Sequence, residues 1–377
     1  MGSQRTKDFL ILNYLAGVVF VSFAQLILPD RFFLDAEEIK DMIPGASFQF
    51  SFFDSYNNTA YLYKLLGMGA VLPDWVAAFL SYSIPFLLMG LVARQQKWFF
   101  NSLTAVLFGM WNILMAVYLG MFTKEVWAFS IVAIVMLLSG TRRGIIFGLI
   151  FAMIYAGFFR VYWFLVIGFF IVNFWSARTG KSLKFMVSFQ VFLAIFVFIL
   201  ANVATGQYLS ETRYDINLER TDDGVSEAET MINNVFANDS PIKDWMNGTI
   251  IWGSLLIPFF LLVTAQVQHI LFFGFQIINV IAFIWVVRFL LPKTRSPFSG
   301  LSKKNTMQVH AATAWCVAYS FVQGIFEPDF GSFARHQIIL APMWFSLISC
   351  YNKLRTPAVF HRLPGRTSFI RSTPQEI

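Results

Sequence analysis

Long apolar stretches recur along nearly the whole chain, and short polar clusters separate them. A helix that crosses a membrane needs about 20 mainly apolar residues, and many stretches come close to that length. They are residues 9–28, 75–93, 98–120, 126–140, 144–159, 161–177, 185–204, 267–291, 309–326 and 337–351. The pattern predicts an all-α fold, a polytopic membrane helical bundle of about ten transmembrane helices that forms a single integral membrane domain over residues 1–377.

The composition excludes an ordinary soluble enzyme. Of the 377 residues, 57% are hydrophobic, 18% are aromatic and 13% are charged, whereas a soluble domain carries about 25% charged residues. Both cysteines, Cys316 and Cys350, lie in apolar stretches, so we expect no disulfide scaffold. The first stretch begins like a signal peptide, but it is too long and no convincing cleavage site follows. We therefore interpret it as an uncleaved anchor.

The basic residues favour one orientation of the bundle. The formal charge is +7, but Lys and Arg occur in small clusters beside apolar stretches and form no long basic patch, so we expect no nucleic-acid partner. With the N-terminus in the cytoplasm, most Lys and Arg fall on the cytoplasmic side, as is typical of membrane proteins, and nearly all acidic residues fall on the other side. Both termini are then cytoplasmic, and residues 352–377 form a cytoplasmic tail.

Two loops on the non-cytoplasmic side are too long to be simple connectors. Residues 29–74 and 205–248 contain most of the 21 acidic residues, and loops of this length are often functional. Residues 249–264, which follow the second loop, are interrupted by Pro258. We interpret them as a re-entrant or interfacial segment. The alternative is that residues 249–291 form two ordinary crossings.

Candidate chemistry is confined to the non-cytoplasmic side. The four histidines are scattered, and no metal-binding, phosphate-loop or nucleotide-binding motif occurs, so we expect no metal and no cofactor. Several arginines stand at or near helix ends on this side, and they are Arg31, Arg160, Arg213, Arg220 and Arg335. A guanidinium holds phosphate oxygens through paired charge-assisted hydrogen bonds, which favours a lipid diphosphate headgroup as the ligand. For Arg213 and Arg220 the alternative is that they pair with Asp215, Glu219 or Asp222 as part of the loop structure.

The most specific stretch is Glu327-Pro-Asp-Phe-Gly-Ser-Phe-Ala-Arg-His-Gln337, which joins the last two predicted crossings on the non-cytoplasmic side. Charged groups in so apolar a chain are costly unless they meet polar partners or line a wet cavity. The stretch is therefore a candidate functional site. The alternative is a plain polar turn between helices, in which Gly331 makes the bend.

The same stretch, followed by an apolar final helix, resembles the C-terminal signature of Wzy-like bacterial polysaccharide polymerases, which assemble O-antigen, capsule or exopolysaccharide repeat units. Arg31-Phe-Phe-Leu-Asp35-Ala and Phe53-Asp54-Ser-Tyr56 resemble the first-loop region of this family, and Leu256-Ile-Pro-Phe259 resembles its partly inserted segment. The resemblance implies a GT-C-like bundle, and it makes the two long loops periplasmic.

The resemblance also implies a metal-independent glycosyltransferase in the bacterial inner membrane. Such an enzyme transfers an undecaprenyl-pyrophosphate-linked glycan onto a hydroxyl of another lipid-linked repeat unit at the periplasmic face. The implied partners are this lipid-linked oligosaccharide, the lipid bilayer, a chain-length regulator and a flippase. Two other functions stay open, namely an O-antigen ligase that delivers the glycan to lipid A core, and a lipid-linked oligosaccharide transporter or flippase.

Residue roles follow from this implied reaction. The candidates for binding the leaving diphosphate are Arg335, Arg213, Arg220, Arg160 and Arg31. Preplaced cations that bind the diphosphate more strongly as its charge grows lower the barrier. The candidates for accepting the proton of the attacking hydroxyl are Glu327, Asp35 and His336. The sequence does not choose among them, and the acidic run that Asp35 begins is equally typical of a solvated loop helix.

Overall fold

A computed structural model describes residues 3–28, 33–48, 54–69, 71–211, 232–263, 266–296 and 300–355. Over these ranges the chain forms helices and no strands. The helices are α1 (Ser3–Ile27), α2 (Leu34–Met42), α3 (Ser55–Leu65), α4 (Asp74–Gln96), α5 (Ser102–Leu119), α6 (Lys124–Leu138), α7 (Arg142–Phe158), α8 (Trp163–Arg178), α9 (Leu183–Thr205), α11 (Pro241–Leu256), α12 (Phe260–Val263), α13 (Val267–Lys293), α14 (Lys303–Phe326), α15 (Phe330–Gln337), the 3₁₀-helix η2 (Ile338–Leu340) and α16 (Ala341–Arg355).

Each stretch that the sequence predicts to cross a membrane contains a helix, so the prediction of an all-α bundle is confirmed. Within the described ranges, 6 helices are long and apolar enough to cross a membrane, namely α1, α4, α5, α9, α13 and α14. The helices α6, α7, α8 and α16 have only 15, 17, 16 and 15 residues, at or below the lower end of the usual crossing length. The count of about ten crossings therefore stays a prediction.

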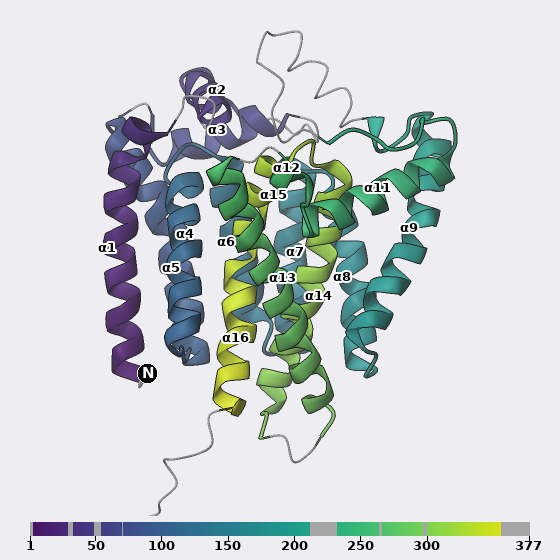
Figure 1. Cartoon of the computed structure of the whole chain (residues 1–377). Helices are drawn as coiled ribbons and strands as arrows, with labels where there is room; N and C mark the ends of the chain where they lie inside the picture. Colours follow the sequence, from purple (N-terminus) through teal and green to yellow (C-terminus); the bar gives the residue numbers. More distant parts are fainter. Residues whose placement is uncertain are drawn as a thin grey trace, which may run out of the picture.

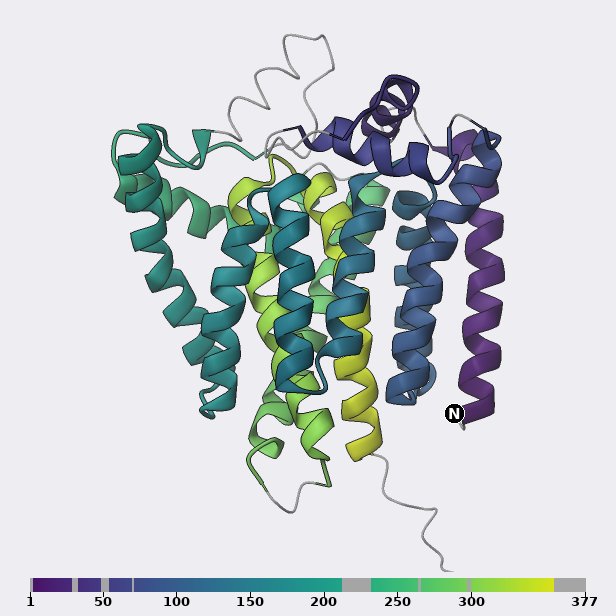
Figure 2. The same cartoon turned by 180° about the vertical axis from the view of Figure 1, so that it is seen from behind.

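The long helices stand side by side, with α1 and α9 at opposite lateral edges (Figures 1 and 2). The short helices α2 and α3 lie across the end of the bundle opposite the N-terminus. The two helices bury Ile39 and Tyr63 in a common apolar cluster with Phe122. The hydroxyl of Tyr63 donates to the carbonyl of Thr123 at 2.9 Å. We call α2 and α3 the outer layer. This hydrogen bond connects the outer layer to Thr123, the residue just before α6.

The helix α14 lies at the centre of the bundle and packs most extensively against α8. Its alanines Ala311, Ala314 and Ala318 are fully buried, and such small residues let neighbouring helices approach closely. The buried Trp315 packs against Trp163 of α8, with ring centroids 5.8 Å apart. The last turn of α14 therefore has a well-defined position at the same end of the bundle as α2 and α3.

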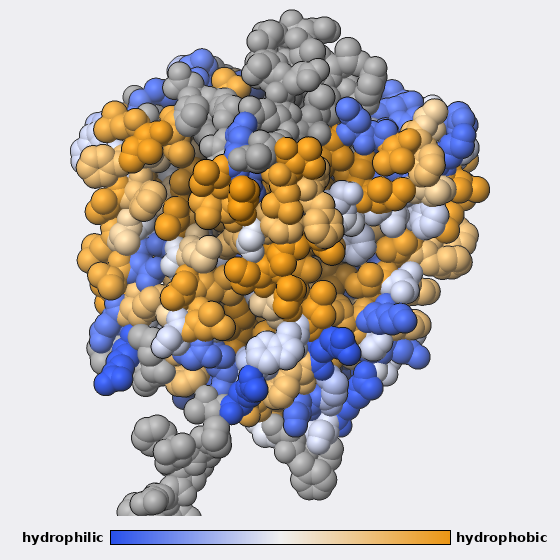
Figure 3. Space-filling model, viewed as in Figure 1, coloured by the Kyte–Doolittle hydropathy of each residue, from blue (hydrophilic) through white to orange (hydrophobic). Residues whose placement is uncertain are grey.

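The surface is polar at both ends of the bundle and mainly apolar between them (Figure 3). Basic residues gather at the end that holds the N-terminus, for example in the last turns of α4, α13 and α16 and at the start of α14. This separation agrees with the charge distribution along the chain. Which side of a membrane each end faces stays a prediction.

The segment around Pro258 is broken into two helices. The helix α11 starts inside the predicted second loop and ends at Leu256, and α12 has 4 residues. Proline has no backbone N–H and interrupts a helix. Both helices lie toward the same end as α2 and α3 (Figure 1). The re-entrant or interfacial interpretation of residues 249–264 stays a prediction, and residues 356–377 of the predicted tail lie outside the described residues.

Candidate functional site

The stretch from Glu327 to Gln337 forms the short helix α15 and not a plain turn. Asp329 caps this helix, because its Oδ1 accepts from the backbone N–H of Ser332 at 2.8 Å and its Oδ2 accepts from the Ser332 hydroxyl at 2.9 Å. A side chain that satisfies the free N–H groups of the first turn stabilises a helix start. The helix then projects its last turn, with Arg335 and His336, into the end of the bundle.

Six ionisable side chains from distant parts of the chain meet at this end. They are Asp35 of α2, Glu125 of α6, Arg160 between α7 and α8, Glu327 after α14, and Arg335 and His336 of α15. We call this group the charged cluster. Its members come from α2, the start of α6, the turn before α8, the end of α14 and α15, and α2 and α15 lie at the end of the bundle opposite the N-terminus (Figure 1).

The carboxylate of Glu125 is the centre of the charged cluster. Its Oε1 accepts from Nη2 of Arg160 at 2.7 Å, lies 2.6 Å from Nε2 of His336 and lies 3.7 Å from Nε of Arg335. Only 2% of Glu125 is exposed, and a buried carboxylate is tolerated when it is paired and hydrogen-bonded. Glu125 therefore holds the two guanidinium groups and the imidazole within reach of one another.

Tyr162 holds Arg160 from its other side, and Gln323 in turn holds Tyr162. Its Nη1 donates to the hydroxyl of Tyr162 at 2.6 Å, and the same hydroxyl accepts from Nε2 of Gln323 at 2.9 Å. Gln323 is fully buried in the last turns of α14. The guanidinium is thus positioned by bonds to α6 and, through Tyr162, to α14.

The imidazole of His336 lies between two carboxylates. Its Nε2 approaches Glu125, and its Nδ1 lies 2.5 Å from Oε1 of Glu327. Nη1 of Arg160 also lies 2.7 Å from Nε2, and one nitrogen cannot accept that hydrogen and donate its own to Glu125. Nη1 carries two hydrogens and reaches both Tyr162 and this nitrogen, so the tautomer of the ring decides which of the two contacts of Nε2 is a hydrogen bond.

Arg335 links the charged cluster to the outer layer. Its Nη1 lies 2.6 Å from Oδ2 of Asp35 on α2, and Oδ1 of Asp35 accepts from the hydroxyl of Tyr56 at 3.3 Å. Burial raises the pKa of Asp35, but the charge and hydrogen bond of Arg335 together with the charge of Lys124 hold this pKa below its usual value. Burial alone lowers the pKa of Arg335, but Glu125 and Asp35 together raise it. Both groups are therefore charged at neutral pH.

The structure thus brings together Asp35, Arg160, Glu327, Arg335 and His336 of the residues that the sequence singles out. The other three, Arg31, Arg213 and Arg220, lie outside the described residues. Sequence reasoning missed Glu125, the central residue. A signal was present, because Glu125 is the only acidic residue between Asp74 and Glu211 in the chain.

An apolar cavity of about 670 Å³ extends from α15, which carries Arg335 and His336 of the charged cluster, to Lys184 and Arg288. Residues of α5, α9, α11, α13, α14, α15 and α16 line it, and most of them are aromatic or aliphatic. The helix α15 contributes Phe330, Ala334 and Gln337, which are spaced so that they share one helix face. Arg335 and His336 of the same helix belong to the charged cluster. The helix α15 therefore separates the charged cluster from this cavity. We call the cavity the apolar groove.

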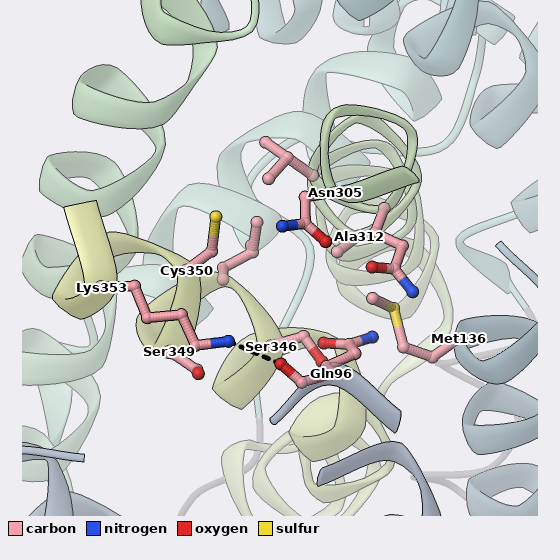
Figure 4. A pocket seen from close by; sticks show the side chains of 11 residues that line it. Gln96, Met136, Asn305, Ala312, Ser346, Ser349, Cys350 and Lys353 are labelled. Carbon is pink, nitrogen blue, oxygen red and sulfur yellow. Dashed lines mark hydrogen bonds between the residues drawn. The ribbon is translucent and has the colours of Figure 1, made fainter. Parts of the chain in front are cut away.

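A second cavity of about 30 Å³ lies near the basic end of the bundle (Figure 4). Gln96, Asn305 and Lys353 are among the residues that line it, and Nζ of Lys353 donates to the carbonyl of Gln96 at 2.5 Å. This volume holds about one water molecule. None of its lining residues belongs to the charged cluster, so it is a separate feature of the fold.

Comparison with protein-family models, with characterised proteins and with solved structures finds no match for this chain. Among the described residues, no group of three or more His, Cys, Asp or Glu side chains is arranged to hold a metal ion. Any assignment of function therefore depends on the charged cluster and the apolar groove.

Proposed function

We propose that this chain is a polysaccharide polymerase of the Wzy-like type. It transfers an undecaprenyl-pyrophosphate-linked glycan onto a hydroxyl of another lipid-linked repeat unit, without a metal or cofactor. The observation that carries the proposal is the position of α15, which presents Arg335 and His336 to the charged cluster and Phe330 and Ala334 to the apolar groove.

A lipid-linked diphosphate has two parts with opposite requirements. Its phosphate groups need cations with oriented N–H groups, and its isoprenoid chain needs an apolar surface. Two arginines lie at one side of α15, and a cavity of about 670 Å³ lined mainly by apolar residues lies at the other. A lipid diphosphate that lies across α15 contacts both the arginines and the cavity, whereas a free anion needs only the arginines.

The proposal places the enzyme in the bacterial inner membrane with about ten crossings. The termini are then cytoplasmic, and the charged cluster faces the periplasm. Two observations support this arrangement. Basic helix ends gather at the end that holds the N-terminus, as expected for a cytoplasmic side, and the charged cluster lies at the opposite end. Lipid-linked repeat units that reach the outer leaflet are therefore accessible to it.

The reaction itself is a substitution at the anomeric carbon of the donor glycan. The acceptor oxygen forms the new glycosidic bond, and the bond to the diphosphate breaks with its electron pair on the leaving phosphate oxygen. Arg335 and Arg160 stabilise the charge that develops there, and such preorganised cations act more strongly in a buried site than in water. In this proposal the hydrogen bonds from guanidinium groups, and not a metal ion, stabilise the departing lipid diphosphate.

The proton of the acceptor hydroxyl has a path into the charged cluster. His336 lies between Glu327 and Glu125, so a proton that Glu327 accepts from the hydroxyl passes on to Nδ1 of the ring, and the carboxylate of Glu125 stabilises the resulting imidazolium. General-base assistance of this kind contributes about 10²- to 10⁴-fold to the rate. Asp35 is a weaker candidate, because its ion pair with Arg335 lowers its pKa and so weakens it as a base.

The test uses purified protein and a defined lipid-linked repeat unit as the sole substrate. A polymerase forms a ladder of longer lipid-linked chains, whereas an O-antigen ligase forms product only after lipid A core is added. A flippase moves the substrate between vesicle leaflets and forms neither product. Arg335→Ala should abolish the ladder, and Arg143→Ala, an exposed arginine at the start of α7, is the matched control. A substrate that stays unextended by the wild-type protein contradicts the proposal.

A further inference from the structure

The arginines of the charged cluster are already engaged by carboxylates. Arg160 is paired with Glu125, and Arg335 is paired with Asp35. These carboxylates compensate the guanidinium charges, so the two arginines alone leave little positive charge for an incoming diphosphate. A further cation is needed, or one of these pairs has to open when the substrate binds.

Lys124, the first residue of α6, is such a cation once an anion is bound. Burial and the nearby Arg160 lower its pKa to about 7 in the empty site, and a diphosphate beside the ammonium raises this pKa and so favours the charged form. Lys124 precedes Glu125 directly, and its side chain has no carboxylate within ion-pair distance in the described part of the chain. Its Nζ lies instead 3.1 Å from the centroid of the Tyr56 ring. The face of an aromatic ring attracts a cation, but it is a weaker acceptor for the three N–H groups of the ammonium than a carboxylate or phosphate oxygen is.

The position of Lys124 connects it with the most accessible ion pair of the charged cluster. The hydroxyl of Tyr56, on whose ring the ammonium rests, donates to Asp35. The side chain of Asp35 is 37% exposed, against 3% for Glu125. An anion that reaches the cluster therefore meets the pair of Asp35 and Arg335 first, and Lys124 lies one aromatic ring away from it.

We propose that Lys124 is a further substrate-binding residue, whose ammonium binds the diphosphate together with Arg335 after the diphosphate displaces Asp35. This assignment rests on the proposed function, because it concerns the same substrate and the same site. The ring of Tyr56 holds the ammonium near the cluster in the absence of substrate. A lysine suits this role because it acts as a compact positive charge with freely rotating donors.

The test measures binding of two probes to the full-length protein in detergent. Inorganic pyrophosphate reports on the headgroup site alone, and farnesyl pyrophosphate adds an apolar chain that needs the apolar groove. Lys124→Gln removes the charge and should weaken the binding of both probes by about tenfold or more, the value of a charge-assisted hydrogen bond. Lys124→Arg retains the charge and should bind both probes nearly as the wild type does.

Lys40→Gln is the matched control. Lys40 lies in the same outer layer and forms an exposed ion pair with Asp74, so this variant changes the net charge equally and should bind both probes like the wild type. If Lys124→Gln loses its fold in detergent, Lys124→Met, which keeps a long side chain against the Tyr56 ring, replaces it. Size-exclusion profiles establish that each variant is folded before its affinity is compared.

The outcomes separate the two proposals. If the wild type binds the probes and Lys124→Gln binds them equally well, Lys124 is not a ligand, and the proposed function stands without it. Unchanged affinity together with lost turnover assigns Lys124 to proton transfer and overturns the inference. If the wild type binds neither probe, the charged cluster is no diphosphate site, and both proposals fail.

Discussion

Removal of the central carboxylate provides the strongest test of the charged cluster. Glu125→Ala leaves Arg160 without its counterion. Only 10% of the Arg160 side chain and 3% of the Glu125 side chain are exposed. Solvent screening is therefore weak, and loss of one partner of a buried pair costs about 3 to 5 kcal/mol. Glu125→Gln keeps an oxygen that accepts from Arg160 but loses the charge, and we expect a cost of about 1.5 to 3 kcal/mol.

Unfolding by sodium dodecyl sulfate in mixed micelles, followed by tryptophan fluorescence, measures these free energies. A double-mutant cycle with Arg160→Met isolates the pair. In the Arg160→Met background, Glu125 has already lost this partner, so Glu125→Gln should cost less than it does in the wild type. The loss of unfolding free energy in the double mutant should therefore be smaller than the sum of the two single losses by at least about 1 kcal/mol. The tryptophan emission of each folded variant should match that of the wild type before denaturant is added.

Asp239→Ala is the control for this experiment. Asp239 and Lys243 form an ion pair of 2.6 Å, but their side chains are 57% and 45% exposed. Exposed pairs contribute little, so this substitution should change the free energy of unfolding by less than about 0.5 kcal/mol. The reasoning about the charged cluster is refuted if Glu125→Ala costs no more than this control, or if the losses in the cycle are fully additive.

Three further predictions concern the reaction and its substrate. His336→Ala should lower chain extension by about 10² to 10⁴-fold, while binding of inorganic pyrophosphate changes little; a parallel loss of binding contradicts a role in proton transfer. Ala334→Trp should fill the apolar groove and weaken binding of farnesyl pyrophosphate but not of inorganic pyrophosphate, and equal effects on both probes contradict a separate groove. The stabilising pair of Asp35 and Arg335 is fully formed above the ordinary Asp pKa of 3.8 and is lost as the pH falls through the lowered pKa of Asp35. The free energy of unfolding of the wild type should therefore decrease as the pH falls below 3.8, and this decrease should be absent in Asp35→Asn. Identical acid profiles of the two proteins contradict the assignment.

The sequence predicted most of the fold, because a membrane-crossing helix is specified locally. The length and apolar character of a stretch such as residues 185–204 are enough to indicate a helix, and α9 forms there. The stretch from Glu327 to Gln337 also stood out on its own, since charged side chains are rare in so apolar a chain. Local sequence therefore determined the class of fold, and it located one side of the candidate site.

Only the tertiary structure decided which side chains meet. Glu125 lies on α6 and Arg160 lies between α7 and α8, and nothing in their local sequence indicates that the start of α6 and the turn before α8 lie beside α15. Tyr56 and Lys124 likewise come into contact only because α3 packs across the start of α6. The physical reason is that apolar periodicity specifies each helix by itself, whereas the contacts among helix ends depend on how the buried faces of all the helices fit together.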